Sequence, residues 1–443
     1  MASLSRLLNK SPFIVKRCYY KIIPFHKRYG YTFSETYKFI QNSIEWDRNK
    51  LKEFQFEKLK ETIKNAYDNV PYYHKLFIDY GINPNISSFE DIRKVPYLTK
   101  SDVRQNYNEL ISKKFNKNLI TFKTSGSTGE KFQFEGTDDL YKKEAAFVLR
   151  AYNMHNSTLY EKPSIWIRRY SPKQGDPISK IDYELNRIYM SPFNLSLTTI
   201  ENYVEYINKS KAKLIVTYPS LANFMALLME EKKIHFDYVE VIHCASEMVL
   251  DEWRNNVFRI LGIKLKAHYG MMEKVSFFSN TIDSDKYAES LEYGYTEIIE
   301  GEVVGTGFLN DAMPFIRYKP GDLAIINEKT EYFKSLPYSV SDFIGRSTDM
   351  IYTLDGRKLS GVNFYTMMYK IQGVEMFQII QKTLTDIEVN IIPSKYFNLE
   401  TYNEISEGIN DRVGECNIKI NKLSELKRTP SGKIKTIINE CKS

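Results

Sequence analysis

The sequence is poor in the residues from which metal sites and covalent frameworks are built. Its four cysteines lie far apart with no CxxC pair, which argues against a zinc ribbon and a disulfide framework and is typical of a reducing compartment. Its six histidines show no paired spacing, so we propose no transition-metal site. It contains no run of about 18 uninterrupted apolar residues, so we expect no transmembrane helix. It also contains no internal repeat and no low-complexity tract.

The chain also lacks a large excess of positive or negative charge. The chain has 62 Lys and Arg against 55 Asp and Glu, and the net charge of +7 is mild for 443 residues. A dedicated nucleic-acid binder usually concentrates its basic residues in a stripe, so we expect no nucleic-acid partner. Hydrophobic residues at 42% and aromatic residues at 14% suffice for a packed interior. The length predicts two or more domains.

The first 30 residues differ from the rest, with seven Lys or Arg and no acidic residue. We favour a basic helix that packs on the domain by its aromatic side, and contact with an anionic membrane surface is the alternative. The segment lacks the small-residue cleavage site and the continuous apolar stretch of a secretory signal. We therefore predict a cytoplasmic protein and leave membrane association through residues 1–30 open.

The section that follows is mainly helical. Apolar residues at helical spacing predict a helix over residues 51–70 that ends before Pro71. Ser87 followed three residues later by Glu90 predicts a capping box at another helix start.

The middle of the chain alternates between strands and helices. Short β-branched or aromatic runs at 213–218, 238–245 and 264–269 predict strands. Two segments of helical length and period, 220–234 and 250–262, lie between them. This order predicts a parallel sheet with right-handed crossovers.

A distinctive polar segment follows each of these strands. The segments are "YPS" at 218–220, "ASE" at 245–247 and "YGMME" at 269–273. Because ligands of such sheets bind at the carboxyl ends of the strands, these segments indicate a binding site.

The last part of the chain changes character again. Antiparallel strands are expected after residue 301, with turns at Asn310-Asp311 and Pro320-Gly321, and Asp355-Gly356 predicts a hairpin. The fold class predicted is α/β with an α+β C-terminal part. We expect a basic segment (1–40), a large domain of mixed and parallel sheets with flanking helices (41–346) and a small mobile α+β domain (347–443).

The stretch "TFKTSGSTGEKFQF" (121–134) has the composition of an anion-binding loop. Gly126 and Gly129 allow a tight turn that exposes amide groups, and four hydroxyl residues add donors, which together suit phosphate oxygens. It is not a Walker loop, because no Ser or Thr follows Lys131. Taken alone, such a loop is more often an ordinary turn.

Five motifs occur in register. "TSGSTGEK", "YGMME", "RYKPGD", "GRSTDM" and "RTPSGKIK" follow one another with spacings that resemble the adenylate-forming superfamily of acyl-CoA synthetases and ligases. "FEKLKETIKNAYDNVPYYHKLF" (56–77) is similar to the phenylacetate-CoA ligase family, and in particular to its CapK-type branch found among capsule and polysaccharide biosynthesis proteins. The resemblance runs from about residue 40 to the end.

That resemblance implies a two-step reaction. A carboxylate attacks the α-phosphate of ATP to give an acyl-adenylate, and an acceptor then displaces AMP. The loop would hold the β- and γ-phosphates, Ser246 and Glu247 would surround the adenine, and Tyr269 with Gly270 would border or stack on the base. Asp322 would accept hydrogen bonds from ribose hydroxyls. The residues implied around the nucleotide are Thr124, Ser125, Gly126, Ser127, Thr128, Gly129, Lys131, Ser246, Glu247, Tyr269, Gly270, Asp322 and Arg346.

The resemblance also assigns catalytic roles. Glu273 would bind Mg²⁺, a hard cation that prefers oxygen ligands beside phosphates. Lys433 would bridge the attacking carboxylate and the α-phosphate and stabilise the developing charge. Asp349 corresponds to the hinge about which the C-terminal domain would rotate. Taken alone, each residue could have a purely structural role. Asp322 could close a turn, Glu273 could be an acidic residue at a helix N-terminus, and Lys433 could be a solvated surface charge.

Two positions depart from the family pattern. Met272 stands where most relatives have Thr or Ser, which removes a hydroxyl expected at the α-phosphate, and Lys131 replaces the usual proline after the glycine loop.

The acyl pocket is expected around residues 166–172 and 217–224. Trp166, Tyr218 and Phe224 would suit an apolar or aromatic acid, whereas Arg168 or Arg169 would suit a polar one. Aromatic residues at such spacing are also common in cores.

The sequence therefore predicts an ATP-dependent carboxylate ligase with ATP and Mg²⁺ as cofactors. Its acceptor would be the thiol of coenzyme A, or an amine or hydroxyl of a glycan precursor in surface polysaccharide biosynthesis. The alternative is a nucleotide-binding scaffold or regulator that kept the fold and lost turnover, which Met272 favours. A third hypothesis is a membrane-associated assembly factor recruited through residues 1–30.

Overall fold

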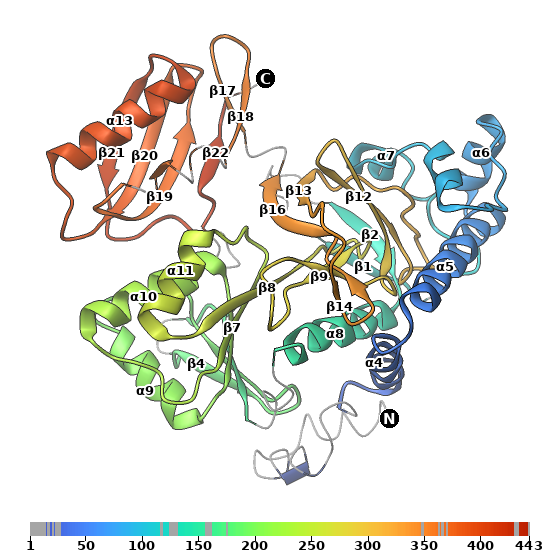
Figure 1. The fold of residues 1–443 in the computed structure, drawn as a ribbon, viewed down its shortest axis with the longest axis horizontal. Helices are drawn as coiled ribbons and strands as arrows, with labels where there is room; N and C mark the ends of the chain where they lie inside the picture. The colour runs from blue at the N-terminus through green and yellow to red at the C-terminus, as the bar shows by residue number, and fades with distance from the viewer. Residues whose placement is uncertain are drawn as a thin grey trace. The chain divides into compact units, whose positions relative to one another are not determined.

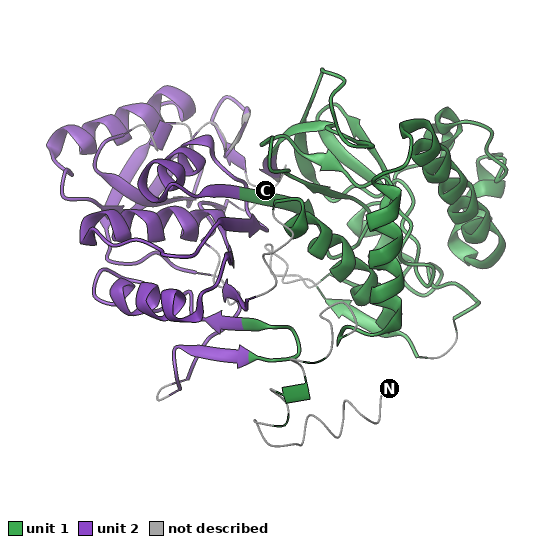
Figure 2. Cartoon of the chain, turned by 60° about the horizontal axis from the view of Figure 1, so that its bottom comes forward, with its two compact units in different colours: residues 1–161, 182–187, 266–343 green, residues 162–181, 188–265, 344–443 purple. Residues whose placement is uncertain are grey.

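The protein is described by a computed structural model. It covers residues 28–115, 118–123, 132–155, 162–173, 176–346, 350–361, 364, 367–368, 371–428 and 434–441, and positions 15, 18, 19 and 22. The chain forms two compact units (Figure 2): unit 1 holds residues 1–161, 182–187 and 266–343, and unit 2 holds 162–181, 188–265 and 344–443. The domain borders at 40/41 and 346/347 stay predictions.

The helices of unit 1 come from the N-terminal part of the chain (Figure 1). They are α4 (Tyr31–Ser43), α5 (Arg48–Asn69), α6 (Pro71–Asp79), the 3₁₀ helix η1 (Phe89–Lys94), α7 (Lys100–Gln105) and α8 (Asp138–Asn153). Helix α5 confirms the helix predicted over 51–70. The Asp47 side chain caps its start by accepting from the amide of Asn49 at 2.9 Å. Pro71 occupies the first turn of α6, where its missing N–H costs no hydrogen bond.

The predicted capping box was one residue out of register. It joins Ser88 to Asp91 rather than Ser87 to Glu90, and it starts the 3₁₀ helix η1. One oxygen of the Asp91 carboxylate accepts from the amides of Ser87 and Ser88 at 2.9 and 3.1 Å. Glu90 instead forms an exposed ion pair with Arg93.

The strands of unit 1 form four pieces of antiparallel structure. They are β1 (Ile120–Lys123), β2 (Gln133–Gly136), β8 (Lys264–Gly270, which crosses the unit border), β9 (Phe277–Ser279), β10 (Ala288–Glu289), β11 (Gly294–Ile299), β12 (Glu302–Gly307), β13 (Asp322–Ile326), β14 (Tyr332–Phe333), β15 (Leu336–Pro337) and β16 (Val340–Arg346). Strands β11, β12, β13 and β16 lie side by side in that order, β8 pairs with β9 and β9 with β10, β1 pairs with β2, and β14 pairs with β15. The antiparallel strands expected after residue 301 are confirmed.

Glycines bring the segment after β8 close to the β11–β12 pair. A Cβ on Gly294 would lie 2.2 Å from the carbonyl oxygen of Val275, and one on Gly307 would lie 2.4 Å from that of Lys274. Larger residues at these positions would displace the chain around Glu273.

Unit 2 contains the predicted alternation of strands and helices. Its elements before residue 266 are β3 (Ser164–Ile167), β4 (Ser179–Asp182), β5 (Arg187–Met190), α9 (Ile200–Ser210), β6 (Leu214–Thr217), α10 (Pro219–Lys232), β7 (Val241–Ala245) and α11 (Asp251–Leu261). Strand β6 is parallel to both β3 and β7, with Ile215 opposite Ile165 and Ile242. Strands β6 and β7 are buried throughout, which explains why they lack an alternating pattern in the sequence.

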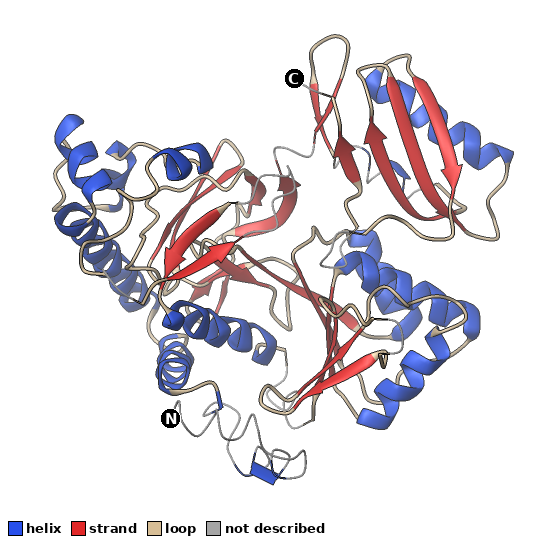
Figure 3. Ribbon diagram, turned by 180° about the vertical axis from the view of Figure 1, so that it is seen from behind, coloured by secondary structure: helices blue, strands red, loops and turns tan. Residues whose placement is uncertain are grey.

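The C-terminal part of unit 2 is α+β (Figure 3). It contains β17 (Met350–Tyr352), β18 (Lys358–Ser360), β19 (Val374–Gln381), β20 (Asp386–Pro393), α13 (Leu399–Val413), β21 (Asn417–Lys422) and β22 (Ile437–Asn439). Strands β17 and β18 form the predicted hairpin, with Gly356 at a φ of 83° in its turn. Helix α13 buries Ile405 and Ile409 against Phe377 and Val389 of the four-stranded sheet. The predicted fold class, α/β with an α+β C-terminal part, is confirmed.

Candidate functional site

Unit 1 brings Tyr269 and Asp322 together at the end of β8. The Tyr269 hydroxyl donates to Asp322 Oδ2 at 2.8 Å, and Asp322 is the first residue of β13. The Tyr269 ring stacks on Phe343 of β16, with the centroids 3.8 Å apart and the planes 9° from parallel. The two predicted nucleotide residues are therefore direct neighbours. Sequence reasoning missed Phe343, which has no motif of its own.

Glu273 is held a few residues further along the chain. Its side chain is buried, and Oε1 accepts from the hydroxyl of the fully buried Tyr318 at 2.8 Å. The next residue, Lys274, adopts a φ of 58° and pairs with Glu144 of α8 at 2.5 Å, with both side chains largely buried. Neither Tyr318 nor Glu144 was predicted, although Tyr318 lies inside the motif "RYKPGD". The hydrogen bond from Tyr318 restrains the carboxylate of Glu273, and the Lys274–Glu144 pair anchors the residue that follows it.

The surroundings of Glu273 suit a magnesium ion shared with substrate phosphates better than a metal ion held by protein ligands alone. Among the described residues, no group of three or more His, Cys, Asp or Glu side chains could hold a metal ion. Mg²⁺ is commonly bound by one or two carboxylates together with substrate phosphates rather than by a cage of protein ligands. A single carboxylate such as Glu273 fits that arrangement.

Met272 and Met271 are partly buried against the main hydrophobic cluster of unit 1. The thioether of Met272 therefore helps to anchor the "YGMME" segment, and it offers no hydroxyl to a phosphate.

Unit 2 brings Ser246 and Glu247 to the carboxyl end of β7. Ser246 is exposed and has a φ of 75°, a left-handed conformation that is uncommon outside glycine. Its hydroxyl accepts from Nη2 of Arg168 at 3.3 Å. Glu247 Oε2 accepts from the hydroxyl of Ser220 at 2.7 Å and from its amide at 3.3 Å, which ties this loop to the first turn of α10.

The three aromatic residues expected in the acyl pocket pack inside unit 2. The Trp166 indole donates to the hydroxyl of Ser164 at 3.0 Å, and Tyr218 and Phe224 are buried. The guanidinium of Arg168 lies over the Tyr218 ring, 4.9 Å from its centroid. Arg168 is buried, whereas Arg169 is exposed with a φ of 57°. The role of the aromatic residues in an acyl pocket stays a prediction.

Several predicted residues lie outside the described part of the chain. These are the phosphate loop Thr124–Lys131, the hinge residue Asp349, Lys433 and the side chain of Arg346. The strands that bracket the loop are described, and they pair with Lys123 opposite Gln133. Arg428 and Ile434, on either side of the Lys433 segment, form an antiparallel bridge.

Comparisons with known proteins show what this chain is similar to. The family model "CapK C-terminal domain" matches residues 351–440. Protein CapK of Staphylococcus aureus is 22% identical over 99% of this chain and all of its own length. Phenylacetate-coenzyme A ligase of Thermus thermophilus is 23% identical over 85% of this chain and 88% of its own. The chain is therefore similar to phenylacetate-coenzyme A ligases over most of its length and to Protein CapK over nearly all of it.

A solved structure shares the fold of this chain. It is a 2-hydroxyisobutyryl-CoA ligase in the postadenylation state, in complex with R3-HIB-AMP. Its TM-score is 0.67 at 16% identity, and the match covers 87% of this chain and 88% of that one. At this identity the match supports the fold alone.

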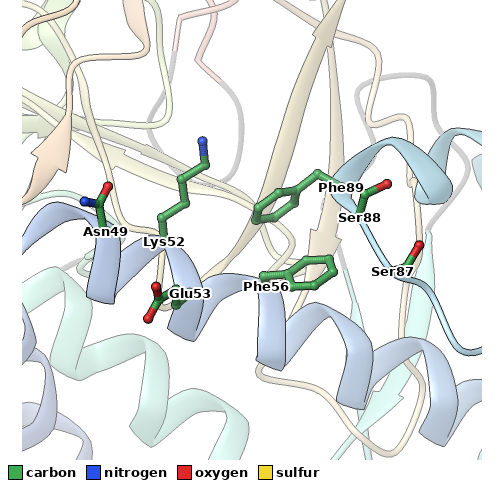
Figure 4. A pocket seen from close by; sticks show the side chains of 7 residues that line it. All are labelled: Asn49, Lys52, Glu53, Phe56, Ser87, Ser88 and Phe89. Carbon is green, nitrogen blue, oxygen red and sulfur yellow. The ribbon is translucent and has the colours of Figure 1, made fainter.

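Two hollows in unit 1 lie away from the predicted site residues. One, of about 460 Å³, is lined by residues of α5 and by residues 87–89, including the rings of Phe56 and Phe89 (Figure 4). The other, of about 610 Å³, is lined by residues of α4, α5, α8 and residues 308–311. Neither hollow is lined by a predicted site residue. The candidate site is therefore identified from the chemistry of its side chains rather than from a cavity.

Among the described residues, no helix is long and apolar enough to span a membrane.

Proposed function

We propose that this protein uses ATP to activate a carboxylic acid as its acyl-adenylate. It then transfers the acyl group to the thiol of coenzyme A, or to an amine or hydroxyl of a glycan precursor. The contact that carries the proposal is the hydrogen bond from Tyr269 to Asp322, because it sets a ribose-binding carboxylate beside an aromatic ring at the edge of a sheet. The relatives that are phenylacetate-coenzyme A ligases support the reaction class.

In the nucleotide complex, Asp322 accepts hydrogen bonds from the ribose hydroxyls while Tyr269 fixes the orientation of its carboxylate. Tyr269 and Gly270 border the adenine from one side. Ser246 and Glu247 act at the same base in this proposal, and Arg346 acts at the ribose or phosphates. The loop Thr124–Lys131 donates amide and hydroxyl hydrogen bonds to the β- and γ-phosphates.

Glu273 contributes a carboxylate oxygen to a magnesium ion, which would neutralise charge on the phosphate tail of ATP. Tyr318 donates to the other side of this carboxylate and keeps it in place. Lys433 supplies a positive charge between the attacking carboxylate and the α-phosphate, where negative charge develops in the transition state. Rotation of the C-terminal domain about Asp349 then exposes the adenylate to the acceptor.

The biological context rests on the CapK resemblance alone. We place the acyl transfer in the biosynthesis of a surface polysaccharide. A cytoplasmic location, with or without membrane contact through residues 1–30, belongs to the same proposal.

The test is exchange of labelled pyrophosphate into ATP, with a panel of aliphatic, aromatic, hydroxy, amino and dicarboxylic acids. Exchange that depends on one class of acid and falls at least about 100-fold in Lys433→Ala supports the proposal. Lys427→Ala is the matched control, because Lys427 is an exposed lysine six positions earlier. Lack of exchange with any acid, together with tight ATP binding by calorimetry, favours the scaffold that Met272 suggested.

A further inference from the structure

The buried guanidinium of Arg168 is unusual among the buried arginines of this chain. Arg150 donates to both carboxylate oxygens of Glu292 and to the carbonyl of Ile40. Arg317 donates to both oxygens of Glu297 and to the carbonyls of Arg93 and Val95. These two arginines are satisfied by a carboxylate and by backbone, as buried charges need to be.

Arg168 has no such partners in the described chain. Its residue is 6% exposed, and its one hydrogen bond goes to the neutral hydroxyl of Ser246 at 3.3 Å. Its Nε is buried without a hydrogen-bond acceptor, and none of the described carboxylates lies within ion-pairing distance. The Tyr218 ring beneath it gives a cation–π contact, which only partly offsets the desolvation of a guanidinium.

The position of Arg168 in the sheet is that of a ligand-binding residue. It directly follows β3, Tyr218 directly follows β6, and Ser246 directly follows β7. These three strands are parallel neighbours, so the three residues meet at their carboxyl edge, where ligands of such sheets bind. The nearby carboxylate of Glu247 is directed to Ser220 instead.

We infer that Arg168 binds a second carboxylate on the acid that this protein activates, so that the substrate class is a dicarboxylic acid. This inference rests on the proposed function. A carboxylate would meet the open Nε–H of the guanidinium with a charge-assisted hydrogen bond and would supply the missing counter-charge. The contact of Ser246 with Arg168 places this anion beside the residues assigned to the nucleotide.

The test compares matched acids of equal length in the pyrophosphate exchange assay: succinate against butyrate, glutarate against valerate, and 4-carboxyphenylacetate against phenylacetate. In the wild-type protein, kcat/KM for the preferred diacid exceeds that of its monoacid at least about 100-fold, the size expected for a buried charge-assisted contact. Arg168→Met abolishes that preference by lowering the diacid rate and sparing the monoacid rate. Lys173→Met, which removes an exposed positive charge on the same segment, leaves the preference unchanged.

Arg168→Lys distinguishes the loss of the anion contact from a folding defect, because lysine keeps the positive charge and part of the packing. It retains a reduced preference for diacids. Equal rates for monoacids and diacids in the wild type, or equal losses for both in Arg168→Met, would overturn the inference while leaving the ligase proposal intact.

A binding measurement without ATP separates the two proposals. The preferred diacid raises the melting temperature of the wild-type protein and of Lys173→Met, and it does not raise that of Arg168→Met. If this Arg168-dependent shift occurs but no acid supports exchange, the anion site stands and the ligase proposal fails. If neither the shift nor a diacid preference occurs, the inference is wrong.

Discussion

The Tyr269 side chain serves two neighbours at once: its ring stacks on Phe343 and its hydroxyl donates to Asp322. The hydroxyl is the part that reaches the predicted ribose-binding carboxylate. The ring and the hydroxyl can be separated by substitution, because phenylalanine keeps the stacking and removes the donor.

Tyr269→Phe is therefore expected to leave the fold intact and to raise KM for ATP about 3–10-fold, which corresponds to the net contribution of one typical hydrogen bond. The measurement is KM for ATP in pyrophosphate exchange at a saturating concentration of acid. Tyr287→Phe is a matched control, because Tyr287 also contacts Phe343 but lies outside the predicted site. An unchanged KM for ATP in Tyr269→Phe would contradict the assignment of Asp322 to the ribose.

At this scale the sequence identifies residues better than it identifies their partners. Tyr269, Glu273 and Asp322 lie in recognisable motifs, and the structure brings Tyr269 and Asp322 together. Phe343, which stacks on Tyr269, and Glu144, which pairs with Lys274 beside Glu273, are distant in the chain and carry no signal in their own neighbourhoods. Such contacts depend on the paths of whole strands and helices, which a motif does not contain.

Among the elements of unit 1, α4 and α8 are joined by a buried ion pair. Arg150 of α8 contacts Glu292 at 2.7 and 3.1 Å and the carbonyl of Ile40 in α4, and Ser43 of α4 donates to the same Glu292. Burial raises the pKa of Glu292, but the charge of Arg150 and these hydrogen bonds outweigh it, so that its pKa lies below its ordinary value.

Arg150→Met is expected to loosen both helices, because it leaves a buried carboxylate without its counter-charge at a cost of about 3–5 kcal/mol. Hydrogen exchange followed by mass spectrometry checks this, with peptides from α4 and α8 compared with peptides from α10 in unit 2. Protection should fall by about two orders of magnitude or more in α4 and α8 and stay unchanged in α10. Unchanged protection in α4 and α8 would show that the pair contributes little.

Element types were predicted more successfully than element starts. The parallel strands β6 and β7 and the helix α5 follow from apolar period and β-branched composition. The start of η1 was missed by one residue because Ser87 and Ser88 are adjacent and Glu90 and Asp91 are adjacent, so the sequence offers two boxes in different registers. The structure shows that the box joins Ser88 to Asp91.

For the whole molecule, one buried carboxyl group makes stability depend on pH near neutrality. Glu289 of β10 is buried and accepts from the hydroxyl of Ser339 at 2.7 Å. Burial raises the pKa of Glu289 from 4.5 to about 7, and hydrogen bonds from Ser339 and Thr296 offset part of this rise. The folded state therefore binds this proton more tightly than the unfolded state does, and stability falls as the pH rises from about 4.5 to about 7.

Glu289→Gln removes this titration and keeps an acceptor for Ser339. The variant should match the wild type at pH 5 and melt at a higher temperature at pH 8, with a difference of about 3 kcal/mol at most. Differential scanning calorimetry at the two pH values measures it. A wild-type melting temperature that does not decrease relative to Glu289→Gln between pH 5 and pH 8 would contradict the raised pKa.

The architecture of the whole chain is consistent with a family whose chemistry is divided between segments far apart in sequence. The likeness to Protein CapK extends over 99% of the chain, but Arg168, to which we assign the choice of acid, lies outside the motifs. Arg168 was one of two adjacent arginines in the sequence, and only its burial separates it from Arg169.

The central claim is that the anion bound by this chain is the phosphate tail of ATP and that an acyl-adenylate follows. Pyrophosphate exchange with the acid panel tests it most directly, with Lys433→Ala and Lys427→Ala measured alongside the wild type. The account predicts exchange that requires one class of acid, is lost in Lys433→Ala and persists in Lys427→Ala. Exchange that is absent with every acid, or that is equally strong in Lys433→Ala, would contradict it.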